Sequence, residues 1–147
     1  MAIEVIEVVS AVIARSDGRL LLTQRRAGTQ FAFHWECPGG KVEPGDRGLK
    51  EALCRELMEE LGMPATTNDL QLLFHDVLES PTGQKYRVNQ YLFRSNTYHE
   101  PKPLEGQGLG WFSPEEIPGL QLCPSLERRW LQLVYVIYEH HEWPQSS

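Results

Sequence analysis

Three closely spaced glutamates are the residues of this sequence most suited to chemistry. Glu56, Glu59 and Glu60 lie in the run Arg-Glu-Leu-Met-Glu-Glu-Leu. Glu56 and Glu60 are four residues apart, which places both on one face of a helix, and Glu59 lies one step around from both. Adjacent carboxylates repel one another unless cations neutralise them, and hard oxygen ligands of this kind select Mg²⁺ or Mn²⁺. The cluster therefore predicts a divalent-metal site on a helix.

An arginine and a glycine-rich segment accompany the three glutamates. Arg55 precedes Glu59 by four residues, so it can offset part of the negative charge or hold one carboxylate with its fork of donors. The glycines between Gly39 and Gly45 let backbone atoms approach a metal or a phosphate without side-chain obstruction. A glutamate-rich helix alone is more typical of a solvated surface. Its combination with Arg55 and the glycines favours a metal-dependent site.

A helix must position these side chains, and the sequence predicts it from about Arg47 to Leu61. Its apolar residues recur at three- and four-residue spacing, which makes a stripe that faces a core. Asp46 is placed to cap the start of this helix, and Gly62 is placed to end it. Between Gly39 and Gly45, the glycines and Pro44 argue against regular structure.

The rest of the chain alternates strand-rich stretches with a second helix. Hydrophobic alternation and turn residues predict a hairpin of Val5 to Arg15 and Leu20 to Gln24, a hairpin of Asp69 to Glu79 and Lys85 to Ser95, a loop from Asn96 to Gly108, a strand from Leu109 to Phe112 and a helix from Pro124 to Glu139. Two helices should cover the two faces of a mixed β-sheet. We therefore expect an α/β (α+β) sandwich of three layers, formed by residues 1–147 as a single domain.

The composition narrows the classes of function. The 147 residues are 41% hydrophobic and 23% charged, as in an ordinary globular protein. A formal net charge of −6 gives no sign of a basic face for nucleic acid, although cations could still bring a polyphosphate to carboxylates. Three cysteines far apart argue against disulfides and against a thiolate zinc site. No apolar run reaches the roughly 20 residues of a membrane span and the start does not look like a signal peptide, so we expect a cytoplasmic protein.

The segment from Gly40 to Met63 resembles the Nudix box, the signature of the Nudix hydrolase family. The pattern is G-x5-E-x7-R-E-U-x-E-E-x-G-U, with U a bulky apolar residue, and the matching positions are Gly40, Arg55, Glu56, Leu57, Glu59, Glu60, Gly62 and Met63. Asp46 stands where the pattern has Glu, and eight residues rather than seven separate it from Arg55. We interpret this as a one-residue insertion that bears on loop geometry and rate, while the catalytic helix is intact.

The resemblance extends to the MutT-type subgroup of that family. Trp35 to Glu43 follows the run W-E-x-P-G-G-K-V-E, and Glu105 to Trp111 follows the stretch E-x-Q-x-x-x-W. This resemblance implies an α/β/α sandwich fold and a Mg²⁺-dependent (or Mn²⁺-dependent) enzyme. It also implies hydrolysis of a phosphoanhydride bond in a nucleoside diphosphate linked to another group X.

The resemblance also implies roles for the carboxylates. Glu56 and Glu60 should bind the metal directly, and Glu59 should be a shared ligand or the general base. The backbone carbonyl of Gly39 is expected to be a further ligand. Glu105, on a loop remote from the helix in sequence, should be another ligand or the base. Whether Glu59 or Glu105 is the base stays open, as does the phosphorus atom that water attacks.

Substrate contacts are expected outside the helix. Arg26 and Lys85 are candidates for phosphate or base contacts. The resemblance places the loop from about Pro118 to Pro124 over the nucleobase, where the amide of Gln121 could donate to and accept from a purine edge. Arg55 should act in catalysis by holding the carboxylates.

Three functions remain open at this point. The first is a (d)NTP pyrophosphohydrolase, of oxidised nucleotides among others, which yields a nucleoside monophosphate and pyrophosphate. The second keeps the chemistry but acts on a nucleotide sugar, ADP-ribose or a capped RNA end. The third is a catalytically silent module that binds a nucleotide or a protein, which Asp46 supports and the intact run from Arg55 to Glu60 opposes. We expect a nucleotide substrate, no membrane or nucleic-acid partner, and a monomer or homodimer.

Overall fold

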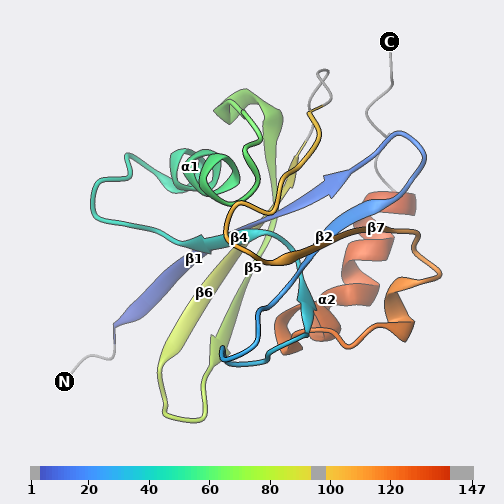
Figure 1. Cartoon of the computed structure of the whole chain (residues 1–147). Helices are drawn as coiled ribbons and strands as arrows, with labels where there is room; N and C mark the ends of the chain where they lie inside the picture. The colour runs from blue at the N-terminus through green and yellow to red at the C-terminus, as the bar shows by residue number, and fades with distance from the viewer. Residues whose placement is uncertain (1–3, 94–98, 140–147) are drawn as a thin grey trace.

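Strands and helices alternate along the chain in the computed structural model, which describes residues 4–93 and 99–139 (Figure 1). The strands are β1 (Val5–Ala14), β2 (Leu20–Gln24), β3 (Trp35–Glu36), β4 (Gly39–Lys41), β5 (Leu70–Glu79), β6 (Lys85–Phe93) and β7 (Gly108–Phe112). The helices are α1 (Leu49–Leu61) and α2 (Pro124–Val134), with single 3-10 turns at Thr67–Asp69 and Ile117–Gly119 and a π-helical turn at Tyr135–Glu139. None of the helices within these ranges is long and apolar enough to cross a bilayer.

The seven strands form one mixed sheet. The central path runs β3-β2-β1-β6-β5, while β4 pairs with β1 and β7 pairs with β2. β1 and β6 are parallel over nine residue pairs, from Val5 opposite Lys85 to Ile13 opposite Phe93, and the other pairings are antiparallel. Both predicted hairpins are confirmed, because β1 pairs with β2 and β5 pairs with β6.

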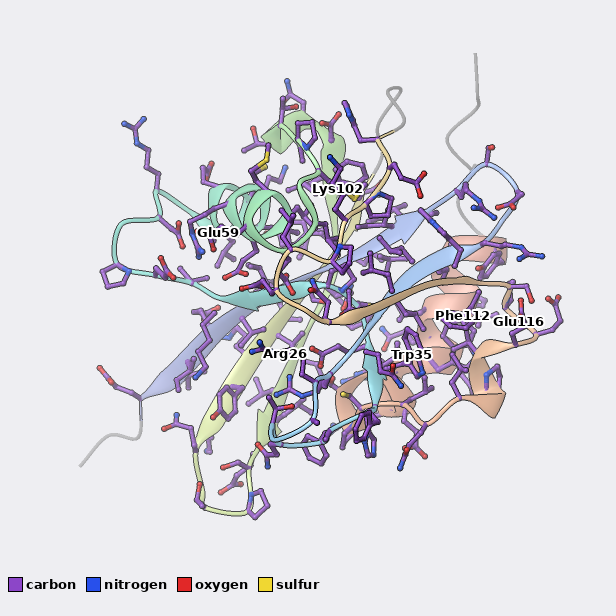
Figure 2. All side chains as sticks on the ribbon, in the orientation of Figure 1. Arg26, Trp35, Glu59, Lys102, Phe112 and Glu116 are labelled. Atoms are coloured by element: carbon purple, nitrogen blue, oxygen red, sulfur yellow. The ribbon has the colours of Figure 1, made fainter. Side chains whose placement is uncertain are left out.

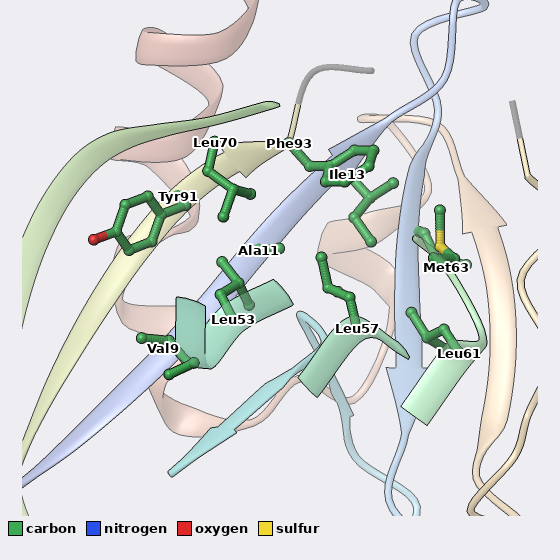
Figure 3. Packing of buried hydrophobic residues seen from close by; sticks show 12 residues of the cluster. Val9, Ala11, Ile13, Leu53, Leu57, Leu61, Met63, Leu70, Tyr91 and Phe93 are labelled. Carbon is green, nitrogen blue, oxygen red and sulfur yellow. The ribbon is translucent and has the colours of Figure 1, made fainter. Parts of the chain in front are cut away.

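The two helices cover opposite faces of this sheet (Figure 1). Successive side chains of a strand point to opposite faces, and β1 therefore contributes to two cores. Val9, Ala11 and Ile13 pack beneath α1, which Figure 3 shows with Leu53, Leu57 and Leu61 against them. Val12 and Leu22 belong to the other core, which α2 closes with Leu126, Trp130 and Leu133. The predicted α/β/α sandwich with a mixed sheet is confirmed.

The ends of α1 differ in part from the prediction. The helix starts at Leu49 rather than Arg47, and its N-cap is Gly48, with no side-chain hydrogen bond. The prediction that Asp46 caps the helix is wrong, because both its carboxylate oxygens are bound by Arg55. At the other end, Gly62 adopts the left-handed conformation (φ 63°) and its N–H bonds back to the helix, as predicted.

The glycine-rich segment before α1 contains a strand that the sequence did not predict. Gly39–Lys41 pairs with Val8, Val9 and Ser10 of β1 as β4. At Gly39 a Cβ atom would lie 2.0 Å from the carbonyl oxygen of Val9. Glycine therefore permits this pairing, although its low strand propensity argued against it. The predicted loop from Asn96 lies partly outside the described residues, and residues 99–107 form neither helix nor strand.

Candidate active site

The C-terminal half of α1 places two glutamates against the two glycines of β4. Glu60 Oε2 accepts a hydrogen bond from the N–H of Gly39 at 3.0 Å. The Glu56 carboxylate lies against Gly40, where an added Cβ would come within 2.5 Å of its Cδ. Both glycines are therefore required for space, because a side chain at Gly40 would displace the Glu56 carboxylate and one at Gly39 would collide with the backbone of Val9. Glu56 is 14% exposed, whereas Glu59 is 53% exposed at the rim.

Burial of these carboxylates makes their negative charge unfavourable. Burial, together with the charges of Glu56 and Glu105, raises the pKa of Glu60 to about 8. Burial also raises the pKa of Glu56, against the opposing charge and hydrogen bond of Arg55. A cation between them would relieve both effects. The donor set of Glu56, Glu60 and the nearby backbone therefore fits a hard divalent ion.

The described residues contain no group of three or more acidic, histidine or cysteine side chains already arranged to hold a metal.

Arg55 connects Asp46, which precedes α1, to the carboxylates of that helix. Its Nε and Nη2 donate to the two oxygens of Asp46 at 2.8 and 2.9 Å, a bidentate pair. Its Nη1 donates to Glu56 Oε1 at 3.1 Å and to Glu59 Oε2 at 3.0 Å. The hydrogen bonds from Arg55 lower the pKa of Asp46 to about 2. Asp46 thus holds Arg55 in place, and Arg55 in turn holds two of the three helix carboxylates.

Glu105 lies on the segment of residues 99–107, which docks on the C-terminal end of α1 and brings Glu105 to this site. The N–H of Lys102 donates to the carbonyl of Leu61, and that of Leu104 donates to the carbonyl of Glu60. Gln107 Nε2 also donates to the Glu60 carbonyl, at 3.0 Å. These bonds satisfy carbonyls at the helix end. Figure 2 shows Glu59 on α1 and Lys102 on the segment that runs to β7.

One cavity is lined by Glu60 and Glu105, and a larger one lies beside it. The smaller, of about 160 Å³, is lined by Glu60, Glu105, Gln107 and Arg26, together with residues of β2 and the segment after it. The larger, of about 250 Å³, lies between the sheet and α2 and has apolar walls that include Phe74 and Leu126. Arg25 and Glu36 line both cavities and form an ion pair at 3.3 Å. The two cavities are therefore neighbours, separated by this pair.

The structure brings most of the predicted site residues together. The helix glutamates, Arg55 and the backbone of Gly39 are in mutual contact, and Arg26 lines the same cavity as Glu105. Lys85 and Gln121 line neither cavity. Lys85 begins β6 opposite Val5 and Glu79, and the exposed Gln121 offers its backbone carbonyl to the N–H of Trp35.

Sequence reasoning missed the polar residues between the two cavities and in the larger one. Glu36 lies inside the W-E-x-P-G-G run, so its neighbourhood was visible in the sequence. Asp76 and Arg129 also line the larger cavity, but they lie on β5 and α2 and are 53 residues apart. No sequence spacing joins two such residues, because the register of the sheet and the packing of the helix bring them together.

Comparison with known proteins agrees with this geometry. A family model described as the NUDIX domain matches residues 6–134. A CTP pyrophosphohydrolase of Escherichia coli is 38% identical over 128 residues, which cover 83% of this chain and 86% of that protein. An 8-oxo-dGTP diphosphatase of Haemophilus influenzae is 34% identical over 126 residues, with 83% and 86% covered. The crystal structure of a MutT NUDIX hydrolase from Burkholderia pseudomallei is similar with a TM-score of 0.75 and 29% identity, over 88% of this chain and 98% of that one.

The family match spans the fold, the glycine-rich strand and the carboxylate helix together. Nudix hydrolases as a family use a divalent metal, for which the buried carboxylates of α1 are suited. The expectation of a hydrolase, rather than a silent binding module, is confirmed by this match and by the similar enzymes. The chain belongs to the NUDIX domain family and is a Nudix hydrolase of the MutT type.

Proposed function

We propose that this enzyme is a Mg²⁺-dependent nucleoside triphosphate pyrophosphohydrolase, with Mn²⁺ as a possible substitute ion. The observation that carries the proposal is the pair of adjoining cavities. One is lined by carboxylates and Arg26, as a metal-bound polyphosphate requires, and the other has the apolar walls that a nucleobase requires. The names of the two similar enzymes, a CTP pyrophosphohydrolase and an 8-oxo-dGTP diphosphatase, support the same substrate class.

The residues that line the smaller cavity and those of α1 have separate roles in the proposed reaction. Glu56 and Glu60 would hold the divalent ion, which when bound neutralises phosphate oxygens and makes a water more acidic. Arg26 faces the same cavity as Glu105 and would bind phosphate oxygens. Arg55 keeps Glu56 and Glu59 in position. Lys85 and Gln121 have no part in this proposal, because they line neither cavity.

A carboxylate that is not bound to metal takes the proton of the attacking water. Glu105 and Glu59 are the two candidates, and both are exposed enough to return the proton to solvent. The water oxygen forms a new bond to phosphorus, and the bond between the bridging oxygen and that phosphorus breaks. Attack at the α- or the β-phosphorus gives the same products, a nucleoside monophosphate and pyrophosphate. Hydrolysis in ¹⁸O-water distinguishes them by which product carries the label.

Product analysis on a substrate panel tests the proposal. The panel contains the common ribo- and deoxynucleoside triphosphates, 8-oxo-dGTP, ADP-ribose and a nucleotide sugar, each with Mg²⁺ and each with excess chelator. We expect monophosphate and pyrophosphate from triphosphates, no turnover in chelator, and recovery when Mg²⁺ is restored. Release of diphosphate and inorganic phosphate would contradict the proposed bond, and turnover confined to ADP-ribose or the nucleotide sugar would contradict the substrate class.

A further inference from the structure

The side chain of Gln107 connects the two segments that carry the carboxylates of the smaller cavity. Its Oε1 accepts a hydrogen bond from the N–H of Glu105 at 2.9 Å, and its Nε2 donates to the backbone carbonyl of Glu60 at 3.0 Å. All three residues line this cavity. One amide group therefore bridges the backbone of a candidate for the general base and the backbone of a helix residue that is expected to hold the metal.

The two ends of this amide bridge cannot be exchanged. The N–H of Glu105 needs an acceptor and the carbonyl of Glu60 needs a donor, so the reverse orientation would place like groups against each other. No backbone carbonyl of residues 4–93 and 99–139 accepts from the N–H of Glu105, which leaves the Gln107 oxygen as its acceptor. A glutamate at position 107 would offer acceptors alone, and a methionine would offer neither group. The bridge therefore requires an amide side chain.

Gly106 lets the chain turn so that this bridge can form. The Gln107 side chain bonds to an N–H only two residues before it, which requires the backbone to reverse at the residue between them. Gly106 has a φ of 75°, in the left-handed region that is unfavourable for residues with a Cβ atom. An added Cβ would lie 3.6 Å from Cδ of Arg26, an ordinary contact. The need for glycine therefore arises from the backbone conformation rather than from lack of space.

Glu105 is exposed and belongs to a segment that forms neither helix nor strand, so its place relative to α1 depends on such bonds. We propose that Gln107 is a positioning residue that fixes Glu105 relative to the metal-binding end of α1, an inference that rests on the proposed function. Loss of the bridge should lower kcat, because a displaced base or ligand is less often in the productive geometry. KM should change much less, because Glu56 and Arg26 stay in place to hold the metal and the phosphates.

The variant Gln107→Met removes both hydrogen bonds and keeps the length of the side chain. With Mg²⁺ and the triphosphate that is hydrolysed fastest, we expect kcat to fall by about 10-fold or more and KM to change by less than about threefold. Gln84→Met is the matched control, because Gln84 Nε2 also bonds to two backbone carbonyls, those of Glu4 and Lys85, but in the turn between β5 and β6. It should keep the wild-type kcat. A folded Gln107→Met enzyme with wild-type kcat would overturn the proposal.

A double variant tests whether Gln107 acts through Glu105. In the Glu105→Gln background, Gln107→Met should lower kcat by less than about threefold, because the carboxylate that Gln107 positions is already lost. A loss of about 10-fold in both backgrounds would contradict the proposal, since Gln107 would then act through α1 or through the fold. Normal turnover by Glu105→Gln would also contradict it, and this outcome would leave the proposed function standing with Glu59 as the base.

Amide hydrogen exchange in the metal-free protein tests the bridge without any reaction. The N–H of Glu105 should exchange at least about 10-fold more slowly in the wild type than in Gln107→Met, because the variant lacks its acceptor. If Gln107→Met does not fold, the wild type alone decides, since exchange of this N–H at the rate of an unprotected amide refutes the bridge. An unprotected N–H in a protein that hydrolyses triphosphates removes the positioning role and leaves the proposed function. A protected N–H without hydrolysis of any triphosphate does the reverse.

Discussion

Replacing Glu60 by glutamine should stabilise the metal-free protein above pH 5, although it should abolish hydrolysis. In the folded state burial raises the pKa of Glu60 to about 8, compared with 4.5 for the free side chain. The folded protein therefore keeps this proton over a pH range in which the unfolded chain releases it. The free energy of unfolding therefore decreases as the pH rises from about 4.5, and this decrease levels off above about pH 8.

The size of the effect follows from the same shift. One pKa unit corresponds to about 1.4 kcal/mol. Between pH 5 and pH 7.5, ionisation of Glu60 should remove about 3 kcal/mol from the free energy of unfolding. Glu60→Gln lacks this ionisation, and its amide oxygen can still accept the hydrogen bond from the N–H of Gly39. The variant should therefore lose much less stability than the wild type over this pH range.

Urea unfolding in excess chelator, followed by tryptophan fluorescence at several pH values, measures the difference. Glu59→Gln is the control, because Glu59 belongs to the same helix but is 53% exposed, and it should keep the wild-type pH dependence. Adding Mg²⁺ should stabilise the wild type at pH 7.5 and have little effect on Glu60→Gln. If wild type and Glu60→Gln show parallel pH dependence without metal, the assignment of Glu60 as a buried, uncompensated carboxylate is refuted.

Three further changes test other parts of the site and the fold. Glu105→Gln should lower kcat by about 10²-fold, as loss of a general base or metal ligand does, whereas Glu115→Gln, on the exposed turn after β7, should not lower it. Normal turnover by Glu105→Gln would leave Glu59 as the base. Asp46→Ala should lower kcat by about 10-fold or more because it frees Arg55, and Asp46→Glu should retain more activity. Equal rates for wild type and Asp46→Ala would show that Asp46 does not hold Arg55 in a position that catalysis needs. Leu57→Ala should lower the free energy of unfolding by about 2–5 kcal/mol in urea titrations, whereas Leu131→Ala, at an 82% exposed position, should change it little. Similar losses of unfolding free energy in the two variants would contradict the assignment of Leu57 to the core.

The parts of the site that follow from short-range spacing could be predicted from the sequence. The helix glutamates and Arg55 lie within six residues, and the helical repeat alone places them on one surface. The cap predicted for Asp46 was wrong for a physical reason. Arg55 donates two charged hydrogen bonds to the Asp46 carboxylate, which are stronger than one bond to a backbone amide, and Gly48 is the N-cap of the helix instead.

Contacts between distant segments could not be predicted in this way. The glycines of β4 looked like a loop because glycine weakens a strand. They nevertheless form a strand paired with β1, because the backbone of β1 leaves no room for a Cβ atom at Gly39 and Glu56 leaves none at Gly40. Asp76 and Arg129 meet only because β5 and α2 face each other across the core. A single sequence holds no periodicity that links these positions.

Glu60 joins three segments of the chain, and this makes the site depend on the fold as a whole. Its side chain accepts a hydrogen bond from Gly39 of β4, and its backbone carbonyl accepts hydrogen bonds from Leu104 and Gln107 of the docked segment. A shift of that segment would therefore move Glu105 relative to the end of α1 at the residue that is expected to hold the metal. Mutations in the segment should thus affect kcat even where they remove no carboxylate, because they change the distance between the base candidate and the metal-binding helix.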